Sequence, residues 1–330
     1  MNPTMTKLLL AKPRGFCAGV VRAIDTVEIA LGHFGTPLYV RKEIVHNQSV
    51  VEKFKARGVR FIDELDEVPP GNVVVFSAHG VSPQVREHAE KRDLKVIDAT
   101  CPLVTKVHAE VHKYKKMGFS IVLIGHEDHE EVEGTLGEAP EIIQVVGSVE
   151  DVAKLSIPDP DKVVALTQTT LSVDESKVML DALRARFPNL TTPPKDDICY
   201  ATQNRQDAVK ALVAQGIDLL LVVGSKNSSN SQRLCDVAIA MGVEAYLIDR
   251  ASQIQSSWCE GKKCIGLTAG ASAPEYLVEE VIALLESKGA KTAEFNFIEE
   301  DVSFSLPQEL NEFRKSNEGK EPLRSLPSLS

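Results

Sequence analysis

The hydrophobic positions of the chain follow two spacings in turn. Short runs of consecutive apolar residues, typical of buried parallel strands, alternate with longer stretches in which apolar residues recur every three or four positions, typical of helices. This alternation continues from one end of the chain to the other. It predicts an α/β protein built on parallel sheets.

The same order of elements occurs three times. Each repeat opens with a cysteine in a helical stretch that ends near a glycine, at residues 15–35, 99–118 and 197–216. A short strand follows, at residues 37–40, 119–125 and 217–224. After a polar loop and a second helix comes a second strand, at residues 59–63, 141–146 and 244–249. A third strand and the polar loop behind it occupy residues 72–82, 162–172 and 263–273.

These repeats predict three α/β modules, at residues 7–99, 100–196 and 197–290, and a C-terminal arm with a tail at 291–330. Ligands of open α/β sheets bind at the carboxyl ends of the strands. If the modules pack around a pseudo-threefold axis, three cysteines and six polar loops therefore meet at one central site. Beyond Phe304 the chain is polar and rich in Pro and Ser, so we expect a short arm to Leu310 and then disorder, and loose residues before Lys7.

The charge and the hydropathy of the 330-residue chain exclude some classes of protein. The net charge of −10 and the pI of 5.4 argue against a general basic face for nucleic acid but leave room for a local anion site. No apolar run reaches the length of a membrane span, and the run LLLA near the start is too short for a signal-peptide core. We therefore expect a cytoplasmic protein without membrane or nucleic-acid partners, whose six cysteines are reduced.

Three cysteines hold the same place in the three repeats: Cys17, Cys101 and Cys199. Free N–H groups and the dipole at the predicted helix N-termini favour thiolates there, and three equivalent thiolates favour a metal centre. Two kinds remain open, a zinc ion with one free position or a 4Fe–4S cluster with one iron free of protein ligands. The other three are interpreted as small buried hydrophobic residues, although the last two have metal-like spacing: Cys235, Cys259 and Cys264.

Six polar loops follow the first and third strands of the repeats, and each leads into a predicted helix. Helix capping alone accounts for Ser, Thr and Asn in any one of them. Six such loops at equivalent positions instead favour an anion pocket of hydroxyl, amide and imidazole donors, with phosphate or diphosphate as the natural anion. Four of the eight histidines lie in these loops: His46, His79, His126 and His129. The other four are interpreted as surface or packing residues: His33, His88, His108 and His112.

The His-rich loop of the second repeat allows two further interpretations. His126 and His129 with Glu131 have the spacing of a zinc site, although this ignores the repeated cysteines. Reductive chemistry also needs a proton donor, and the loop offers Glu130, Glu131 and Glu133. Spacing alone does not choose among these three carboxylates.

Nine segments together resemble the 4-hydroxy-3-methylbut-2-enyl diphosphate reductase family: GFCAGVVRAI, VRKEIVHN, FSAHGVS, DATCPLVTKVH, LIGHEDHEEVEGT, TQTTLSVDE, DDICYATQNRQ, VVGSKNSSNSQRL and TAGASAPE. The resemblance covers roughly residues 8–310. It implies a trefoil of three α/β domains around a pseudo-threefold axis, with one central 4Fe–4S cluster per chain. It also implies that Cys17, Cys101 and Cys199 hold this cluster.

The resemblance further implies roles for the loop residues. A diphosphate pocket is matched by His46, His79, His129, Ser228, Ser229, Asn230 and Ser272. Glu131 matches a proton-relay glutamate, and Thr169 matches a threonine near the substrate hydroxyl. The implied reaction is reductive dehydroxylation of (E)-4-hydroxy-3-methylbut-2-enyl diphosphate to isopentenyl and dimethylallyl diphosphate. The substrate oxygen binds the open iron, and two electrons come from an external donor, a ferredoxin or flavodoxin with its reductase.

Two other classes of function stay open beside this one. Three thiolates with an open position also suit a zinc hydrolase or lyase. A labile cluster also suits a non-enzymatic redox sensor, although the acidic charge argues against a DNA-bound one.

Overall fold

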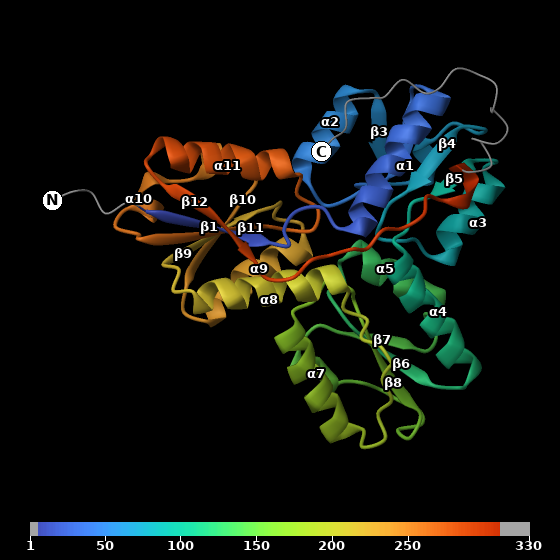
Figure 1. The fold of residues 1–330 in the computed structure, drawn as a ribbon. Helices are drawn as coiled ribbons and strands as arrows, with labels where there is room; N and C mark the ends of the chain where they lie inside the picture. Colours follow the sequence, from blue (N-terminus) through green and yellow to red (C-terminus); the bar gives the residue numbers. More distant parts are fainter. Residues whose placement is uncertain (1–5, 311–330) are drawn as a thin grey trace.

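Each of the three repeats forms a parallel sheet of its own in the computed structural model, which describes residues 6–310 (Figure 1). The strands are β1 Lys7–Lys12, β2 Leu38–Arg41, β3 Val59–Ile62, β4 Val73–Phe76, β5 Lys95–Asp98, β6 Ser120–Ile124, β7 Ile143–Val146, β8 Val163–Thr167, β9 Leu219–Val223, β10 Glu244–Ile248, β11 Cys264–Ala269 and β12 Lys291–Asn296.

The strand order repeats from sheet to sheet. The first sheet has the order β3-β2-β4-β5, the second β7-β6-β8, and the third β10-β9-β11-β1-β12. In each, the strand that follows the cysteine helix lies between the second and third strands of its repeat. We name the three lobes built on these sheets the first, second and third units; Figure 1 shows them at the upper right, the bottom and the left.

The helices also occupy equivalent places. They are α1 Ala18–Phe34, α2 Gln48–Ala56, α3 Pro83–Lys91, α4 Pro102–Lys116, α5 Glu130–Glu138, α6 Val149–Val152, α7 Val173–Arg186, α8 Tyr200–Ala214, α9 Ser229–Ala240, α10 Ser256–Cys259 and α11 Glu275–Ser287, with short 3-10 helices at Leu65–Glu67 and Ala251–Gln253. In each unit the cysteine helix and the second helix pack on one face of the sheet, and the third helix packs on the other.

Uninterrupted apolar strands make this layering possible. Successive strand residues point to opposite faces. In β9, Leu219 and Leu221 pack against α11, whereas Leu220 and Val222 pack against α8 and α9. A strand covered by helices on both faces needs an apolar residue at every position, which explains the continuous runs in the sequence.

The sheets differ from the predicted modules at both ends of the chain. β1 lies in the third sheet between β11 and β12, not in the predicted first module at 7–99. Its four central residues are buried, so it needs helices on both faces, and the third sheet offers an interior position. The segment at 291–330, predicted as an arm, begins as β12, the edge strand of the same sheet.

The chain after β12 crosses from the third unit to the first (Figure 1). Glu300 pairs with Arg205 of α8, with Oε1 lying 3.0 Å from a guanidinium nitrogen. Further along, the Ser305 carbonyl accepts a hydrogen bond of 2.7 Å from Arg22 of α1. Leu310 is buried in the core of the first unit. The crossing segment therefore joins the helices of two cysteines.

The sequence predicts loose residues before Lys7 and disorder after Leu310, and the structure tests only a part of this. Thr6 is fixed, because its carbonyl accepts from Lys291 N at 2.9 Å and its hydroxyl donates to the Lys262 carbonyl at 3.1 Å. The prediction of loose residues before Lys7 is therefore wrong for Thr6. The rest of that prediction and the predicted disorder after Leu310 concern residues 1–5 and 311–330, which lie outside the described residues.

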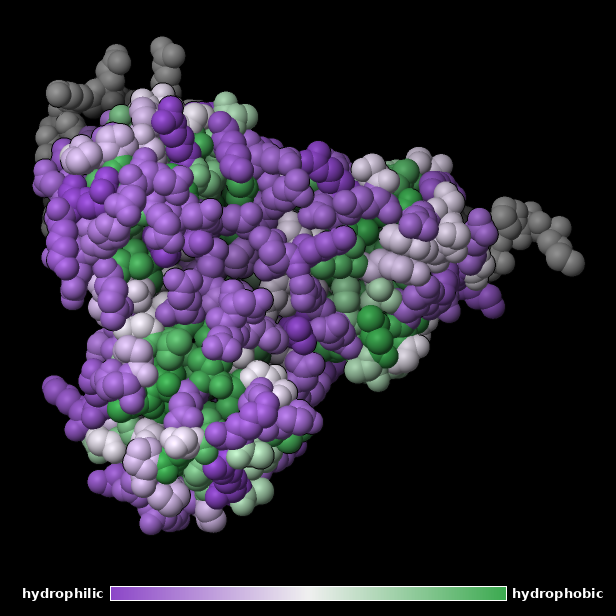
Figure 2. Space-filling model, turned by 180° about the vertical axis from the view of Figure 1, so that it is seen from behind, coloured by the Kyte–Doolittle hydropathy of each residue, from purple (hydrophilic) through white to green (hydrophobic). Residues whose placement is uncertain are grey.

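The surface is mostly hydrophilic. Figure 2, seen from behind, shows polar side chains over most of this face and apolar side chains gathered over the second unit at the bottom and the third unit at the right. Large exposed hydrophobic residues include Val178 in the second unit and Met241 in the third. No helix within residues 6–310 is both long and apolar enough to cross a membrane.

The Arg205–Glu300 pair gives a test of the crossing segment. Arg205 is fully buried and also donates to the Gly15 carbonyl at 2.8 Å. Glu300→Gln leaves the buried guanidinium without its counter-charge, so we expect the free energy of unfolding to fall by about 3 kcal/mol. Urea unfolding measures this change, and Glu299→Gln, at an exposed neighbour, is the matched control. If both variants have the same free energy of unfolding, the Arg205–Glu300 pair does not stabilise the crossing segment.

Candidate active site

The three repeated cysteines are the N-cap residues of α1, α4 and α8. Each donates its backbone N–H to a carbonyl in the loop after the third strand of a neighbouring unit. The pairs are Cys17 to Ala271 at 3.1 Å, Cys101 to Ala78 at 2.9 Å and Cys199 to Thr169 at 2.9 Å. Each cysteine is therefore held by the unit next to its own, and the three bonds run in one direction around the molecule.

One cavity lies where these loops meet. It contains about 680 Å³ of space between atoms, part of it open to solvent. Every residue predicted for the site lines it: Cys17, His46, His79, Cys101, His129, Glu131, Thr169, Cys199, Ser228, Ser229, Asn230 and Ser272. Residues separated by up to 255 positions thus share one space, as the threefold packing predicts.

The donor set fits a metal cluster better than a single zinc ion. The three cysteines are free thiols. Thiolates on one tetrahedral zinc ion stand about 3.8 Å apart, given bonds of about 2.3 Å. Among the described residues, these three sulfur atoms are not all within 4.8 Å of one another. Gly19 lets Cys101 approach the start of α1, because a Cβ on Gly19 would lie 2.7 Å from Cys101 Sγ.

Burial controls the protonation of two of these thiols. It raises the pKa of Cys101 to about 12 and that of Cys199 to about 11. The expectation that helix N-termini favour thiolates is therefore outweighed by burial at both. A bound metal replaces the thiol protons, so burial of this kind makes metal binding and proton release one event.

Thr202 is a cavity residue that the sequence analysis missed. Its hydroxyl lies 3.2 Å from Cys199 Sγ and accepts a hydrogen bond of 3.1 Å from Asn230 Nδ2. Asn230 Oδ1 in turn accepts from Ala271 N at 2.9 Å. Thr202 therefore connects a cysteine with the polar loop of the third unit. Its only signal in the sequence is its position three residues after the N-cap Cys199.

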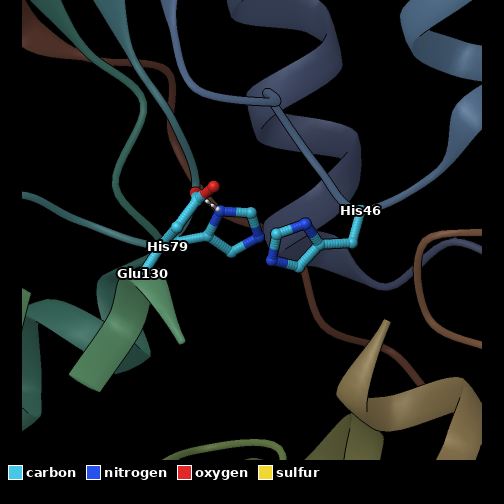
Figure 3. Close-up of side chains that lie close together, drawn as sticks. All are labelled: His46, His79 and Glu130. Carbon is cyan, nitrogen blue, oxygen red and sulfur yellow. Dashed lines mark hydrogen bonds and ion pairs between the residues drawn. The ribbon is translucent and has the colours of Figure 1, made fainter. Parts of the chain in front are cut away.

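Three histidines from two units form one cluster. The rings of His46 and His79 stack with centroids 4.0 Å apart. The His129 ring meets both edge-on, at 5.2 Å and 5.8 Å. Figure 3 shows Glu130 reaching His79 from the start of α5, with His46 on the other side of the His79 ring. The Nδ1 of His79 lies 2.9 Å from Glu130 Oε2.

His129 is held in one neutral form. Its Nδ1 accepts a hydrogen bond of 3.1 Å from the backbone N–H of Glu131. The remaining ring proton therefore lies on Nε2. Burial, and then the neighbouring histidines His79 and His46, lower the pKa of His129 to about 2. His129 is thus a neutral hydrogen-bond donor at the cavity wall.

Glu131, in the first turn of α5, and Thr169, in the loop after β8, form a buried pair in the second unit. The Glu131 carboxylate accepts from Thr169 N at 2.6 Å and from its hydroxyl at 2.9 Å. Burial raises the pKa of Glu131 to about 7, and the bonds from Thr169 oppose this rise. A carboxyl group that titrates near neutral pH can both give and take a proton there.

Hydroxyl groups of the third unit complete the wall. Ser228 is the N-cap of α9, and its Oγ lies 3.5 Å from that of Ser272. Ser272 donates to the His46 carbonyl at 2.8 Å, and Ser229 donates to the Thr170 carbonyl at 3.2 Å. The third unit is thereby bonded to loops of both other units at the cavity.

The other metal sites considered from the sequence are not supported by the positions of their ligand atoms. Within residues 6–310, His126, His129 and Glu131 do not place three ligand atoms within 4.8 Å of one another. His46, His79 and Glu130 do, but the hydrogen bond between His79 and Glu130 already accounts for part of that closeness. Cys235 is buried, and the other two cysteines border different clusters, Cys259 that of α11 and Cys264 that of α8 and α9.

The remaining histidines and carboxylates lie away from the cavity. Glu138 pairs with His108 at 2.9 Å and with His112 at 2.8 Å, and His88 lies 3.4 Å from Asp66. The packing and surface interpretation holds for these three histidines. Glu133, the third proton-donor candidate, is exposed and lies 3.8 Å from Arg41.

The chain is similar over most of its length to proteins of one family. Residues 8–286 match the family described as LytB protein. The chain is 57% identical over 309 residues to a 4-hydroxy-3-methylbut-2-enyl diphosphate reductase of Azoarcus sp., covering 93% of this chain and 99% of the relative. It is 56% identical to the enzyme of the same name from Dechloromonas aromatica, covering 92% and 100%.

A solved structure is also similar. It is the E-1-hydroxy-2-methyl-but-2-enyl-4-diphosphate reductase from Plasmodium falciparum, with a TM-score of 0.92 and 40% sequence identity. The match covers 96% of this chain and all of that one. The three-sheet arrangement described above is therefore that of the solved enzyme.

The raised pKa of Glu131 has a measurable effect on stability. In the unfolded chain this carboxyl ionises near pH 4.5, whereas in the folded protein it keeps its proton up to about pH 7. Its contribution is therefore complete below pH 4.5 and is lost as the pH rises through 7. Between pH 4.5 and 8, the free energy of unfolding of the wild type should therefore fall by about 3 kcal/mol more than that of Glu131→Gln. Urea unfolding at several pH values measures it; parallel curves would contradict the assignment.

Proposed function

The chain belongs to the LytB family, and from this premise we propose how its central cavity works. The protein is an oxidoreductase of isoprenoid biosynthesis, which reduces (E)-4-hydroxy-3-methylbut-2-enyl diphosphate to isopentenyl and dimethylallyl diphosphate. The reaction takes two electrons and two protons, breaks the terminal C–O bond and releases water. One observation carries the proposal: the thiols, the neutral-pH carboxyl and the anion-binding loops line the same cavity.

Cys17, Cys101 and Cys199 hold a 4Fe–4S cluster in this proposal. Their spacing beyond single-zinc distances supports a cluster over one zinc ion. Such a cluster, when bound, passes electrons one at a time and has one iron free of protein ligands. The cysteine positions at three helix N-termini also place N–H dipoles around the sulfur atoms.

The diphosphate binds the loops opposite the cysteines. None of the described lining residues is Lys or Arg, so the anion is bound by imidazoles, hydroxyls and the start of α9. A second hollow shares His46, His129 and Ser229 with the cavity, and it also carries Lys226 and Arg233. Asp128 and Glu130 line this hollow as well. Arg233 is paired with Glu175 and Asp236, so the hollow offers no excess of positive charge.

Glu131 supplies the proton for the departing oxygen. Its Oε2 shares a hydrogen bond with the Thr169 hydroxyl, so Thr169 orients the carboxyl group and extends its reach to a substrate hydroxyl. With a pKa of about 7, Glu131 is protonated in a large fraction of molecules at neutral pH. Donation makes water the leaving group, and its departure is easier than that of hydroxide.

The electrons come from outside the chain in this proposal. A ferredoxin or flavodoxin with its reductase is the donor, because the reaction consumes two electrons per substrate and a cluster passes one at a time. We also propose that the protein works in the cytoplasm, where free thiols such as these six persist.

Turnover with a chemical reductant tests the function directly. The anaerobically purified protein should convert the hydroxymethylbutenyl diphosphate into the two isomeric products. Glu131→Gln should lower kcat at least about a hundredfold, because the general acid is lost, and should leave iron content unchanged. Glu133→Gln, an exposed carboxylate of the same helix turn, is the control and should keep its rate. A wild-type protein without turnover, or an active Glu131→Gln, would contradict the proposal.

Metal content tests the cluster separately. The wild-type protein should hold about four iron and four sulfide per chain. Cys101→Ala should lose most of both, whereas Cys235→Ala, at a buried cysteine outside the cavity, should keep them. Zinc without sulfide after anaerobic reconstitution would favour a zinc hydrolase or lyase instead. A full cluster without turnover would favour a redox sensor.

A further inference from the structure

Two of the three clustered histidines have a carboxylate at Nδ1, and the third does not. His79 Nδ1 lies 2.9 Å from Glu130 Oε2, and His46 Nδ1 lies 3.3 Å from Glu43 Oε2. His129 Nδ1 instead accepts a backbone N–H. The closer of the two carboxylate contacts is the one made by Glu130, and Figure 3 shows it in line with the His79 ring.

The cluster cannot hold a positive charge on every ring. All three ring centroids lie within 5.8 Å of one another. His129 stays neutral, and burial together with the charge of His79 lowers the pKa of His46. Glu130 keeps its own charge, since His79, His46 and Lys42 lower its pKa against the effect of burial.

We infer that Glu130 is a positioning residue: its carboxylate holds the His79 ring through Nδ1, so that the imidazolium form of this ring presents its Nε2 proton to the diphosphate. An ionised carboxylate only accepts hydrogen bonds, so the proton on Nδ1 is fixed by the 2.9 Å contact. The second ring proton then lies on Nε2, the other side of the ring. This inference rests on the proposed function, because it names the diphosphate as the anion.

The fold holds Glu130 close enough to do this. Glu130 is the first residue of α5, in the second unit, whereas His79 lies in the loop after β4 of the first unit. α5 meets that loop at two glycines, since a Cβ on Gly134 would lie 3.4 Å from the Gly80 carbonyl carbon. The close approach of these two backbones brings the carboxylate to the imidazole.

Neighbouring carboxylates of the same helix turn point elsewhere. Glu131 is bonded to Thr169, and Glu133 is exposed beside Arg41. The groups in contact with His79 are Glu130, His46, His129 and the Ser77 hydroxyl, which lies 3.3 Å from Nδ1. The carboxylate of Glu43 lies behind the stacked His46 ring, and the charge of His79 contributes to the lowered pKa of Glu43. Glu130 is therefore the one anion in direct contact with His79 among the described residues.

One positive charge matters in this cavity because its lining contains no Lys or Arg among the described residues. A hydrogen bond between an imidazolium and a phosphate oxygen is charge-assisted and about twice as strong as a neutral one. The carboxylate behind the ring acts as outer carboxylates do behind metal-bound histidines, by fixing the tautomer and the orientation.

Inorganic diphosphate is the probe for this inference, because its binding needs no electron transfer. Calorimetric titration of the cluster-loaded protein should show an affinity about tenfold lower in Glu130→Gln, the loss that outer carboxylates cause at metal sites. For the organic substrate, KM should rise by a similar factor while kcat stays within about twofold. Glu133→Gln removes the same charge from the same helix turn and should change neither value.

The pH dependence and the imidazole signals separate positioning from a general structural effect. Diphosphate affinity is therefore measured at several pH values in the wild type and in Glu130→Gln, and the two pH profiles should differ. Nitrogen NMR of the wild type should show a proton on His79 Nδ1 that is hydrogen-bonded to Glu130. In Glu130→Gln the tautomer population of His79 should change. Iron and sulfide contents should match the wild type.

Equal diphosphate affinities for Glu130→Gln and Glu133→Gln would overturn the role of Glu130. An unchanged His79 tautomer in Glu130→Gln would overturn it as well. If the wild type binds no inorganic diphosphate at all, the anion pocket itself is wrong, and the proposed function fails with it. If the wild type binds inorganic diphosphate and both variants bind it equally well, only the role of Glu130 is contradicted and the proposed function stands. The two failures are therefore distinguishable.

Discussion

Three backbone hydrogen bonds hold the site together, one from each repeated cysteine to the loop of a neighbouring unit. Each bond fixes a helix N-terminus against the carboxyl end of a third strand, where the polar loops also begin. The sulfur atoms, the loop hydroxyls and the imidazoles are therefore positioned by the same contacts between units. No single unit contains the site, because the thiols and the anion-binding groups come from all three.

Burial then shifts the pKa values of several groups of this cavity. It lowers the pKa of His129 to about 2, raises that of Glu131 to about 7 and raises those of Cys101 and Cys199 to about 12 and about 11. The same low-dielectric environment thus favours the neutral forms of an imidazole, a carboxyl group and two thiols. The carboxylate of Glu130 is the exception, since His79, His46 and Lys42 together lower its pKa despite its burial.

Much of this could be predicted from sequence because it repeats. The strands, the cysteine helices and the loops recur in the same order, and their residues do line one cavity. What could not be predicted depends on packing between distant segments. Nothing near β1 in sequence shows that it completes the third sheet, and nothing near Thr202 shows that it meets Asn230. Glu130 and Glu131 are adjacent, and only the fold directs one to His79 and the other to Thr169.

The place of β1 also sets the order in which the protein can be completed during synthesis. β1 emerges from the ribosome before its partners β11 and β12, which lie more than 250 residues later. At translation rates of roughly 5–20 residues per second, the partner strands are synthesised on the order of tens of seconds after β1. Cys17 lies between β1 and α1, and its backbone N–H is bonded to the Ala271 carbonyl beyond β11, so its position is set only after β11 has formed. The three cysteines are therefore brought together late in synthesis, although Cys17 is made first of the three.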